Sequence, residues 1–163
     1  ISAVEGGKLA RETKATFAGA GHTLHTISAE SPIPAEFPPA LLMTFRTRRE
    51  ENILTALAFA QFDYFVAPTH ERVNWAMGLG LPMFALTPTI GPYAPLNLEL
   101  VERSDVAVRL GNGHESSQFA SELESVRASG QLIQMANQGW GKHPINGFDT
   151  IAEYLMSHFG PRS

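Results

Sequence analysis

Short apolar runs alternate along the chain with segments in which apolar residues recur every three or four positions. The runs predict strands and the periodic segments predict amphipathic helices. Strands are expected at residues 22–27, 41–45, 63–67, 81–86 and 106–110. Helices are expected at residues 3–18, 47–58, 68–78, 95–103, 119–130, 132–136 and 148–159.

This alternation of strands and helices predicts the fold class. Several strand candidates are apolar throughout, which favours parallel strands buried on both faces. We therefore expect a Rossmann-like three-layer α/β/α sandwich with a mostly parallel sheet, formed by residues 1–163 as a single domain. Ligands of such sheets bind beyond the carboxyl ends of the strands, here in loops 46–50, 67–71 and 87–97.

Residues typical of helix starts occur in each of these three loops. Thr47 and Glu50 have the spacing of a capping box. Thr69 is expected to be the N-cap of the next helix, and Pro95 suits the first turn of the one after it. Each loop is therefore expected to lead into a helix N-terminus.

Composition narrows the classes of function. The chain has 163 residues, of which 44% are hydrophobic and 17% are charged, so a folded core is expected. A net charge of -4 argues against nucleic acid as a partner. We find no cysteine, no transmembrane segment and no signal peptide, and we expect a cytoplasmic protein. Because the chain begins at Ile1, we expect it to be a piece of a longer protein.

Common catalytic and cofactor motifs are absent from the sequence. It contains no GxGxxG, GxxxxGK[ST], GxSxG or HExxH pattern, so no cofactor is predicted. His22 and His25 are three positions apart on a predicted strand and would face opposite sides, so no metal is predicted. No residue is assigned as a catalytic acid or base.

Residues 41–110 carry an ordered set of features that points to a family, most clearly in the run 62–110. Asp63 opens a strand, Gly80-Leu81-Pro82 opens the next one, and Pro95 and Asn97 stand in a Pro-x-Asn motif before a helix. This order resembles the C-terminal, donor-binding half of GT-B glycosyltransferases. It is most similar to the branch with the bacterial peptidoglycan N-acetylglucosaminyltransferase and the UDP-glycosyltransferases.

The resemblance implies a nucleotide-sugar donor, with a UDP-sugar favoured, and an N-terminal domain as partner that would supply the catalytic base. It also implies that helix N-terminal amides in loop 67–71 bind the pyrophosphate, helped by Thr69 and His70. The loop that begins with Arg46 would contact the base. The family's glycine-rich first strand and loop are expected to precede Ile1. The candidate substrate-binding residues are Arg46, Thr47, Thr69, His70, Glu71, Asn74, Tyr93 and Asn97.

Departures from the family pattern keep a second hypothesis open. Trp75 aligns with the acidic residue that commonly holds the ribose, and Tyr93 aligns with the acidic residue that contacts the donor sugar. The chain would then be a degenerate GT-B-like domain with a structural or protein-interaction role. A flavodoxin-like or other nucleotide-binding domain also fits the expected topology. Simpler roles also remain open for individual residues. Thr69 could act only as a helix cap, and arginines 46, 48 and 49 could form a solvated helix start.

Overall fold

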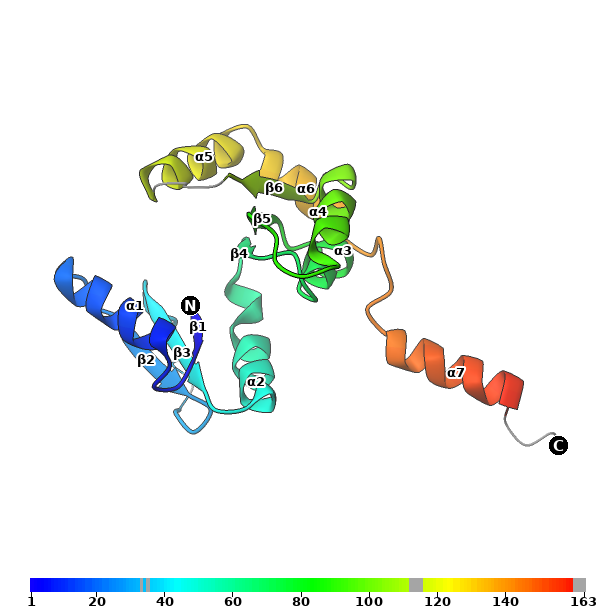
Figure 1. Ribbon diagram of the computed structural model, residues 1–163, viewed down its shortest axis with the longest axis horizontal. Helices are drawn as coiled ribbons and strands as arrows, with labels where there is room; N and C mark the ends of the chain where they lie inside the picture. The colour runs from blue at the N-terminus through cyan, green and yellow to red at the C-terminus, as the bar shows by residue number, and fades with distance from the viewer. Residues whose placement is uncertain (33, 35, 112–115, 160–163) are drawn as a thin grey trace. The chain divides into compact units, whose positions relative to one another are not determined.

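The computed structural model describes residues 1–32, 34, 36–111 and 116–159, and over these residues the fold is α/β (Figure 1). The described part contains seven α-helices, one short 3-10 helix and six strands in two parallel three-stranded sheets. The chain divides into two compact units, Ile1–Phe62 (unit 1) and Asp63–Ser163 (unit 2). Each sheet belongs to one unit.

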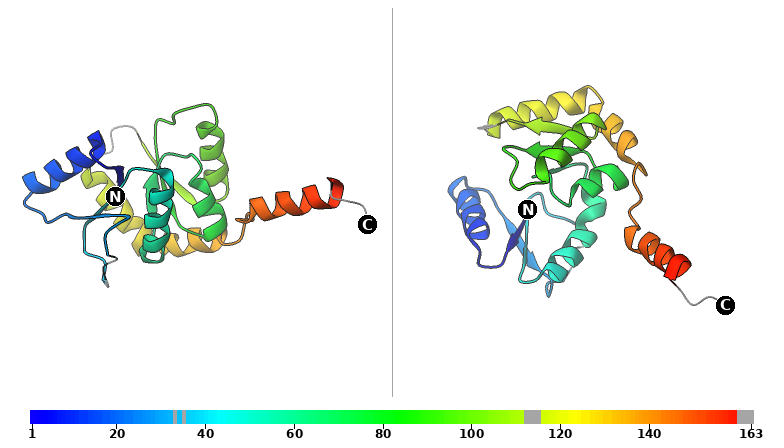
Figure 2. Two further views of the ribbon diagram at one scale, coloured as in Figure 1. Left: turned by 90° about the horizontal axis from the view of Figure 1, so that it is seen from below. Right: turned by 45° about the vertical axis from the view of Figure 1, so that its right-hand side comes forward.

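Unit 1 is a small three-layer structure. Its elements are β1 (Ser2–Val4), α1 (Lys8–Gly19), β2 (His25–Ser28), β3 (Leu41–Phe45), α2 (Arg48–Ala58) and η1 (Phe59–Gln61). The strand order is β1-β3-β2, with Ala3 opposite Thr44. Successive residues of β3 face opposite sides, so Leu42 packs with Ala10 of α1 whereas Met43 packs with Leu54 of α2. The two helices therefore cover opposite faces of the sheet (Figure 2).

Unit 2 also has helices on its parallel sheet. Its elements are β4 (Phe65–Ala67), α3 (Val73–Leu79), β5 (Met83–Leu86), α4 (Ala94–Arg103), β6 (Ala107–Leu110), α5 (Ser116–Ala128), α6 (Gln131–Gly139) and α7 (Gly147–Phe159). The strand order is β4-β5-β6. Phe84 and Leu110 of the sheet pack with Val126 of α5 and Met135 of α6.

Glycines allow α3 and α6 to pack closely. A Cβ atom at Gly139 would lie 1.9 Å from the carbonyl oxygen of Ala76 on α3. Gly80 ends α3 in the left-handed conformation, with φ of 65°, and a Cβ there would lie 2.7 Å from the carbonyl oxygen of Ala136. A side chain at either position would force the two backbones apart, so both glycines are needed for this contact.

The prediction of an α/β fold with parallel strands is confirmed, and three details of it are wrong. The strands form two sheets where one was expected. Residues 2–4 form strand β1, and the first helix begins only at Lys8, because the Gly6-Gly7 turn separates the two elements. Helix α3 begins at Val73 and its N-cap is Arg72, so Thr69 is not the cap.

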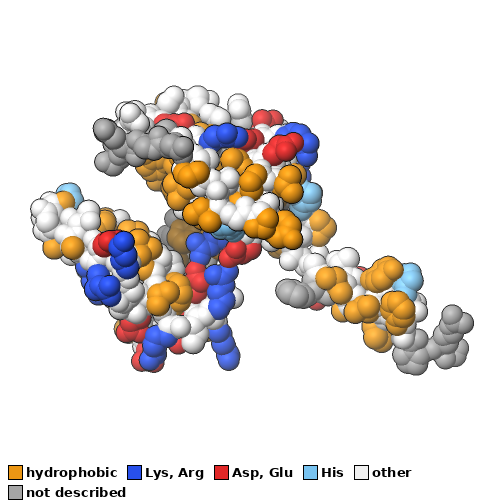
Figure 3. Space-filling model, viewed as in Figure 1, with side chains coloured by type: hydrophobic (Ala, Val, Ile, Leu, Met, Phe, Trp, Pro, Cys, Tyr) orange, Lys and Arg blue, Asp and Glu red, His pale blue; other side chains and the backbone are white. Residues whose placement is uncertain are grey.

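Helix α7 has the predicted apolar stripe, but all of its described side chains are exposed. Ile151, Leu155 and Phe159 are 57%, 49% and 77% exposed. Apolar side chains are accordingly visible along this helix in the space-filling view (Figure 3). The apolar stripe correctly predicted a helix at these positions. The stripe is not buried against any of the described residues.

Candidate functional site

A tight glycine turn joins β1 to α1 in unit 1. Gly6 has φ of 66°, a conformation that glycine adopts without a steric penalty. The Gly7 N–H donates to the carbonyl oxygen of Val4 at 2.9 Å, and a Cβ on Gly7 would lie 2.9 Å from that same oxygen. Gly7 is the N-cap of α1 and offers no side-chain cap, so the helix's positive N-terminal end is not covered by a capping side chain.

A cavity of about 270 Å³ lies beside this turn, at the carboxyl ends of the three strands of unit 1. Arg11 and Lys14 of α1 contribute two positive charges to its lining, and Glu5 contributes one negative charge. The lining also includes four hydroxyl groups, those of Thr26, Ser28, Ser31 and Thr44. Cations, hydroxyls and a helix N-terminus together are the groups that bind phosphate in proteins.

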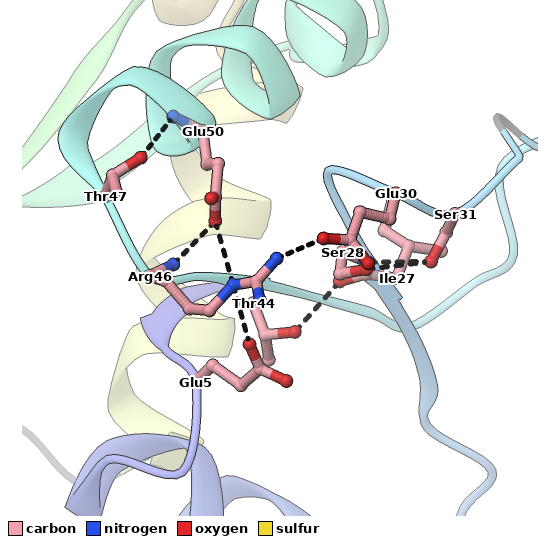
Figure 4. Close-up of polar contacts among 9 residues, drawn as sticks. All are labelled: Glu5, Ile27, Ser28, Glu30, Ser31, Thr44, Arg46, Thr47 and Glu50. Atoms are coloured by element: carbon pink, nitrogen blue, oxygen red, sulfur yellow. Dashed lines mark hydrogen bonds and ion pairs between the residues drawn. The ribbon is translucent and has the colours of Figure 1, made fainter.

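Three of the hydroxyls are held by hydrogen bonds that involve β2 or the loop after it. The Ser31 hydroxyl accepts from the Ser28 N–H at 2.9 Å and lies 3.2 Å from the Ser28 hydroxyl. The Thr44 hydroxyl donates to the carbonyl oxygen of Ile27 at 3.2 Å (Figure 4). The cavity wall is therefore preorganised by contacts of β2 with β3 and with the loop after β2.

Arg46 connects the loops that follow all three strands of unit 1 (Figure 4). Its guanidinium bonds to Glu30 in the loop after β2, and lies 3.5 Å from Glu5 after β1 and 3.8 Å from Glu50 in α2. The hydrogen bond to Glu30, followed by the charges of Glu30, Glu50 and Glu5, raises the pKa of Arg46. A guanidinium with three carboxylates around it holds the loops together, and a ligand would have to compete with those carboxylates for it.

Thr47 caps α2 as predicted. Its hydroxyl accepts from the Glu50 N–H at 3.2 Å. The Glu50 carboxylate returns toward the chain before the helix, where it accepts from the Arg46 N–H at 2.8 Å. The capping-box prediction is thus confirmed for Thr47, whereas the Glu50 carboxylate accepts from the N–H of Arg46 and not from that of the N-cap residue. The Thr47 hydroxyl is used to cap the helix.

In unit 2 the structure brings Thr69 and Asn97 together. The Thr69 hydroxyl donates to the carbonyl oxygen of Ala94 at 2.8 Å, and the Asn97 side-chain amide donates to the carbonyl oxygen of Thr69 at 3.0 Å. Thr69 is completely buried. It therefore supports the loop after β4 and does not present its hydroxyl at the surface.

The amides at the start of α3 are also occupied. The N–H groups of Val73, Asn74 and Trp75 donate to the carbonyl oxygens three residues earlier, at 3.2, 3.3 and 2.9 Å. The first N–H groups of α3 are therefore hydrogen-bonded within the loop and the helix, as is the His70 N–H, which donates to the carbonyl oxygen of Pro68 at 2.9 Å. The physical reason is that the chain forms a tight turn before α3 instead of beginning the helix at residue 69.

The remaining candidates lie at the surface of unit 2. His70 is half-buried, whereas Glu71, Asn74 and Tyr93 are exposed. Asn74 and Trp75 line a cavity of about 550 Å³ together with residues of the connection to α7. Tyr93 is the N-cap residue of α4 and is 73% exposed. Six of the eight candidates thus belong to unit 2, and Arg46 and Thr47 belong to unit 1.

The unit 1 cavity contains residues that the sequence analysis missed. The predicted helix at residues 3–18 included Gly6 and Gly7, so the strand before them was not expected. Arg11 and Lys14, which follow the two glycines, were therefore not predicted as site residues. The available signal was the short run Ser2-Ala3-Val4, followed after Glu5 by two glycines. A strand, a glycine turn and a helix in that order are typical of phosphate-binding loops in α/β proteins.

Comparisons with family models, curated proteins and solved structures find no match to this chain. Within the described residues, no group of three or more His, Asp or Glu side chains is placed to hold a metal ion. None of the helices in that part of the chain combines the length and apolar character needed to cross a bilayer.

Proposed function

We propose that the chain binds the nucleotide part of a nucleotide sugar and serves as the donor-binding part of a GT-B-like glycosyltransferase. The observation that carries this proposal is the unit 1 cavity, where the Gly6-Gly7 turn, the start of α1 and two cations meet at the carboxyl ends of parallel strands. A UDP-sugar is the donor class that the sequence resemblance favours.

The charges of the cavity support a phosphorylated ligand. Arg11 and Lys14 outnumber Glu5, so the lining carries an excess of positive charge. The Arg11 guanidinium bonds to the carbonyl oxygen of Gly6, which holds it beside the turn. A volume of about 270 Å³ is near the lower end of small-molecule sites, so the cavity would hold the phosphates and part of the ribose and leave the base and the sugar outside it.

The hydroxyls and carboxylate of the cavity suit the rest of a nucleotide. Ser28 and Ser31 offer hydroxyls that donate and accept, and Glu5 accepts from hydroxyl groups such as those of a ribose. No group in the cavity is assigned as a catalytic base. We therefore expect this chain alone to bind a donor without transferring its sugar.

A thermal-shift panel with UDP, GDP, ADP and their sugar conjugates tests the proposal. A nucleotide present at 10 to 100 times its Kd should stabilise the fold by about 1.4–2.7 kcal/mol. Arg11→Gln and Lys14→Gln should each abolish most of that shift because they remove the cations of the cavity. Arg103→Gln is the matched control, since Arg103 lies on α4 of unit 2 and its side chain is 72% exposed.

A degenerate domain with a protein-interaction role is the second candidate. Two observations favour it: the apolar face of α7 is exposed, and the Thr69 hydroxyl and the first amides of α3 are already hydrogen-bonded. It predicts no stabilisation of the folded chain by any nucleotide of the panel. A nucleotide-selective shift that Arg11→Gln removes would contradict it.

A further inference from the structure

A larger cavity, of about 590 Å³, lies in unit 2 at the amino end of β6. This edge of the sheet is opposite to the one where the loops after β4 and β5 lie, because the strands are parallel. Its volume is within the range of small-molecule sites. The lining residues are Asp105, Ala107, Ser129, Gln131, Gln134, Met135, Asn137 and Gln138.

Four carboxamide side chains from one helix dominate this lining. Gln131, Gln134, Asn137 and Gln138 all belong to α6. Among the described residues none of these four side chains makes a hydrogen bond within the protein, and all four residues are exposed. Each carboxamide can donate and accept at once, so together they offer paired donors and acceptors to a ligand.

Asp105 occupies a position where glycine would be less strained. The Val106 N–H donates to the carbonyl oxygen of Val101, and the Asp105 N–H to that of Glu102, which is the Schellman pattern at the end of α4. This pattern requires a left-handed residue, and Asp105 has φ of 55°. Within the described part of the chain, Asp105 is the only non-glycine residue with positive φ. Within the described residues the Asp105 carboxylate makes no hydrogen bond or ion pair, so it is available to the cavity that it lines.

The negative charge of the cavity disfavours anionic ligands. None of its lining residues is cationic, and the Asp105 carboxylate would repel phosphate or carboxylate groups. A carboxylate only accepts hydrogen bonds, so the ligand must donate to it. Ala107 and Met135 add a small apolar surface. A neutral molecule that is rich in hydroxyl groups meets all of these conditions.

We propose that this cavity is a binding site for a neutral saccharide, with Asp105 accepting from a pair of hydroxyls and Gln131, Gln134 and Gln138 completing the hydrogen bonding. The site is independent of the nucleotide cavity of unit 1. The two proposals can therefore fail separately.

The test is an NMR titration of the ¹⁵N-labelled full chain with maltose and chitobiose. Either disaccharide should shift the side-chain amide signals of the α6 carboxamides in a saturable way, with a Kd no weaker than about 10 mM. Asp105→Gly should raise that Kd at least about tenfold without harm to the fold, because glycine suits the left-handed position. Gln134→Ala should weaken binding similarly, since alanine keeps the helix intact.

Two controls make the result specific. Gln118→Ala removes an exposed carboxamide from α5, outside the cavity, and should leave the Kd unchanged. Asp105→Gly should also leave nucleotide stabilisation unchanged. The proposal is overturned if neither disaccharide shifts these signals, if Asp105→Gly binds as the parent does, or if glucose 6-phosphate or an uncharged blocked peptide binds at these residues more tightly than the disaccharides do.

Discussion

The buried Thr69 residue is connected to α4 by two hydrogen bonds, one of which comes from Asn97. Its hydroxyl donates to the Ala94 carbonyl oxygen at 2.8 Å, while the Asn97 amide donates to the Thr69 carbonyl oxygen at 3.0 Å. The pair joins the loop after β4 to the first turns of α4. It therefore fixes the carboxyl-end loops of unit 2 without presenting either hydrogen-bonded group to a ligand.

Thr69→Val should destabilise unit 2 by about 0.5–1.5 kcal/mol, because valine keeps the shape but removes the buried hydrogen bond to the Ala94 carbonyl. Urea unfolding followed by tryptophan fluorescence measures this, since both tryptophans, Trp75 and Trp140, lie in unit 2. Thr69→Ser keeps the hydroxyl and should cost less. A double-mutant cycle with Asn97→Ala should give a coupling of at least about 0.5 kcal/mol; strict additivity would show that the two bonds act independently.

Gly139→Ala should destabilise unit 2 by about 1–3 kcal/mol or more. The new methyl would lie 1.9 Å from the backbone oxygen of Ala76, so α3 and α6 would have to separate. Gly147→Ala is the matched change, because no atom lies within 4 Å of its added Cβ, and it should be neutral or stabilising. Equal effects of the two substitutions in urea unfolding would contradict the close contact of α3 with α6.

Acid should weaken unit 2 through Glu102. Two nitrogens of Arg109 donate to the Glu102 carboxylate at 2.7 and 2.6 Å, and this hydrogen bonding lowers the pKa of Glu102 from its ordinary value of 4.5. A lowered folded-state pKa means that the stabilisation is present above pH 4.5 and is lost as the pH falls through the folded-state pKa. The parent chain should therefore lose more stability below pH 4.5 than the Arg109→Gln variant does. Parallel pH profiles of Tm for the two proteins would show that the Glu102–Arg109 pair does not cause the loss.

Thr47→Ala should weaken the start of α2 by about 1 kcal/mol, because the Glu50 N–H loses its side-chain acceptor. Thr47→Asp keeps an acceptor at the N-cap and should preserve stability. Hydrogen exchange of the α2 amides measures the effect within unit 1. Unchanged exchange in Thr47→Ala would mean that the cap contributes nothing.

Local features of the fold could be predicted from the sequence, and features that depend on distant residues could not. The Thr47 cap was predictable because the cap and its partner Glu50 lie three residues apart. The role of Thr69 was not, because its acceptor is 25 residues away and no local pattern shows it. The division of the strands into two sheets likewise depends on pairing between segments that are distant in the chain.

Most of the candidate residues predicted from the sequence lie in unit 2, whereas the unit 1 cavity was not predicted. Thr69 and Asn97, both predicted from the sequence, are joined by a hydrogen bond, but this bond supports the loop after β4. The unit 1 cavity was missed because β1 has only three residues, too few to separate a strand from a helix by periodicity. Its cations, Arg11 and Lys14, follow the turn on α1, and their spacing alone resembles an ordinary solvated helix face.

An NMR titration of the ¹⁵N-labelled chain with UDP-N-acetylglucosamine tests whether unit 1 binds a nucleotide-sugar donor. We expect saturable shifts of the Gly6 and Gly7 amide signals, competition by UDP, and loss of both effects in Arg11→Gln. A folded chain whose Gly6 and Gly7 signals stay unchanged up to about 10 mM ligand would contradict a donor site in unit 1.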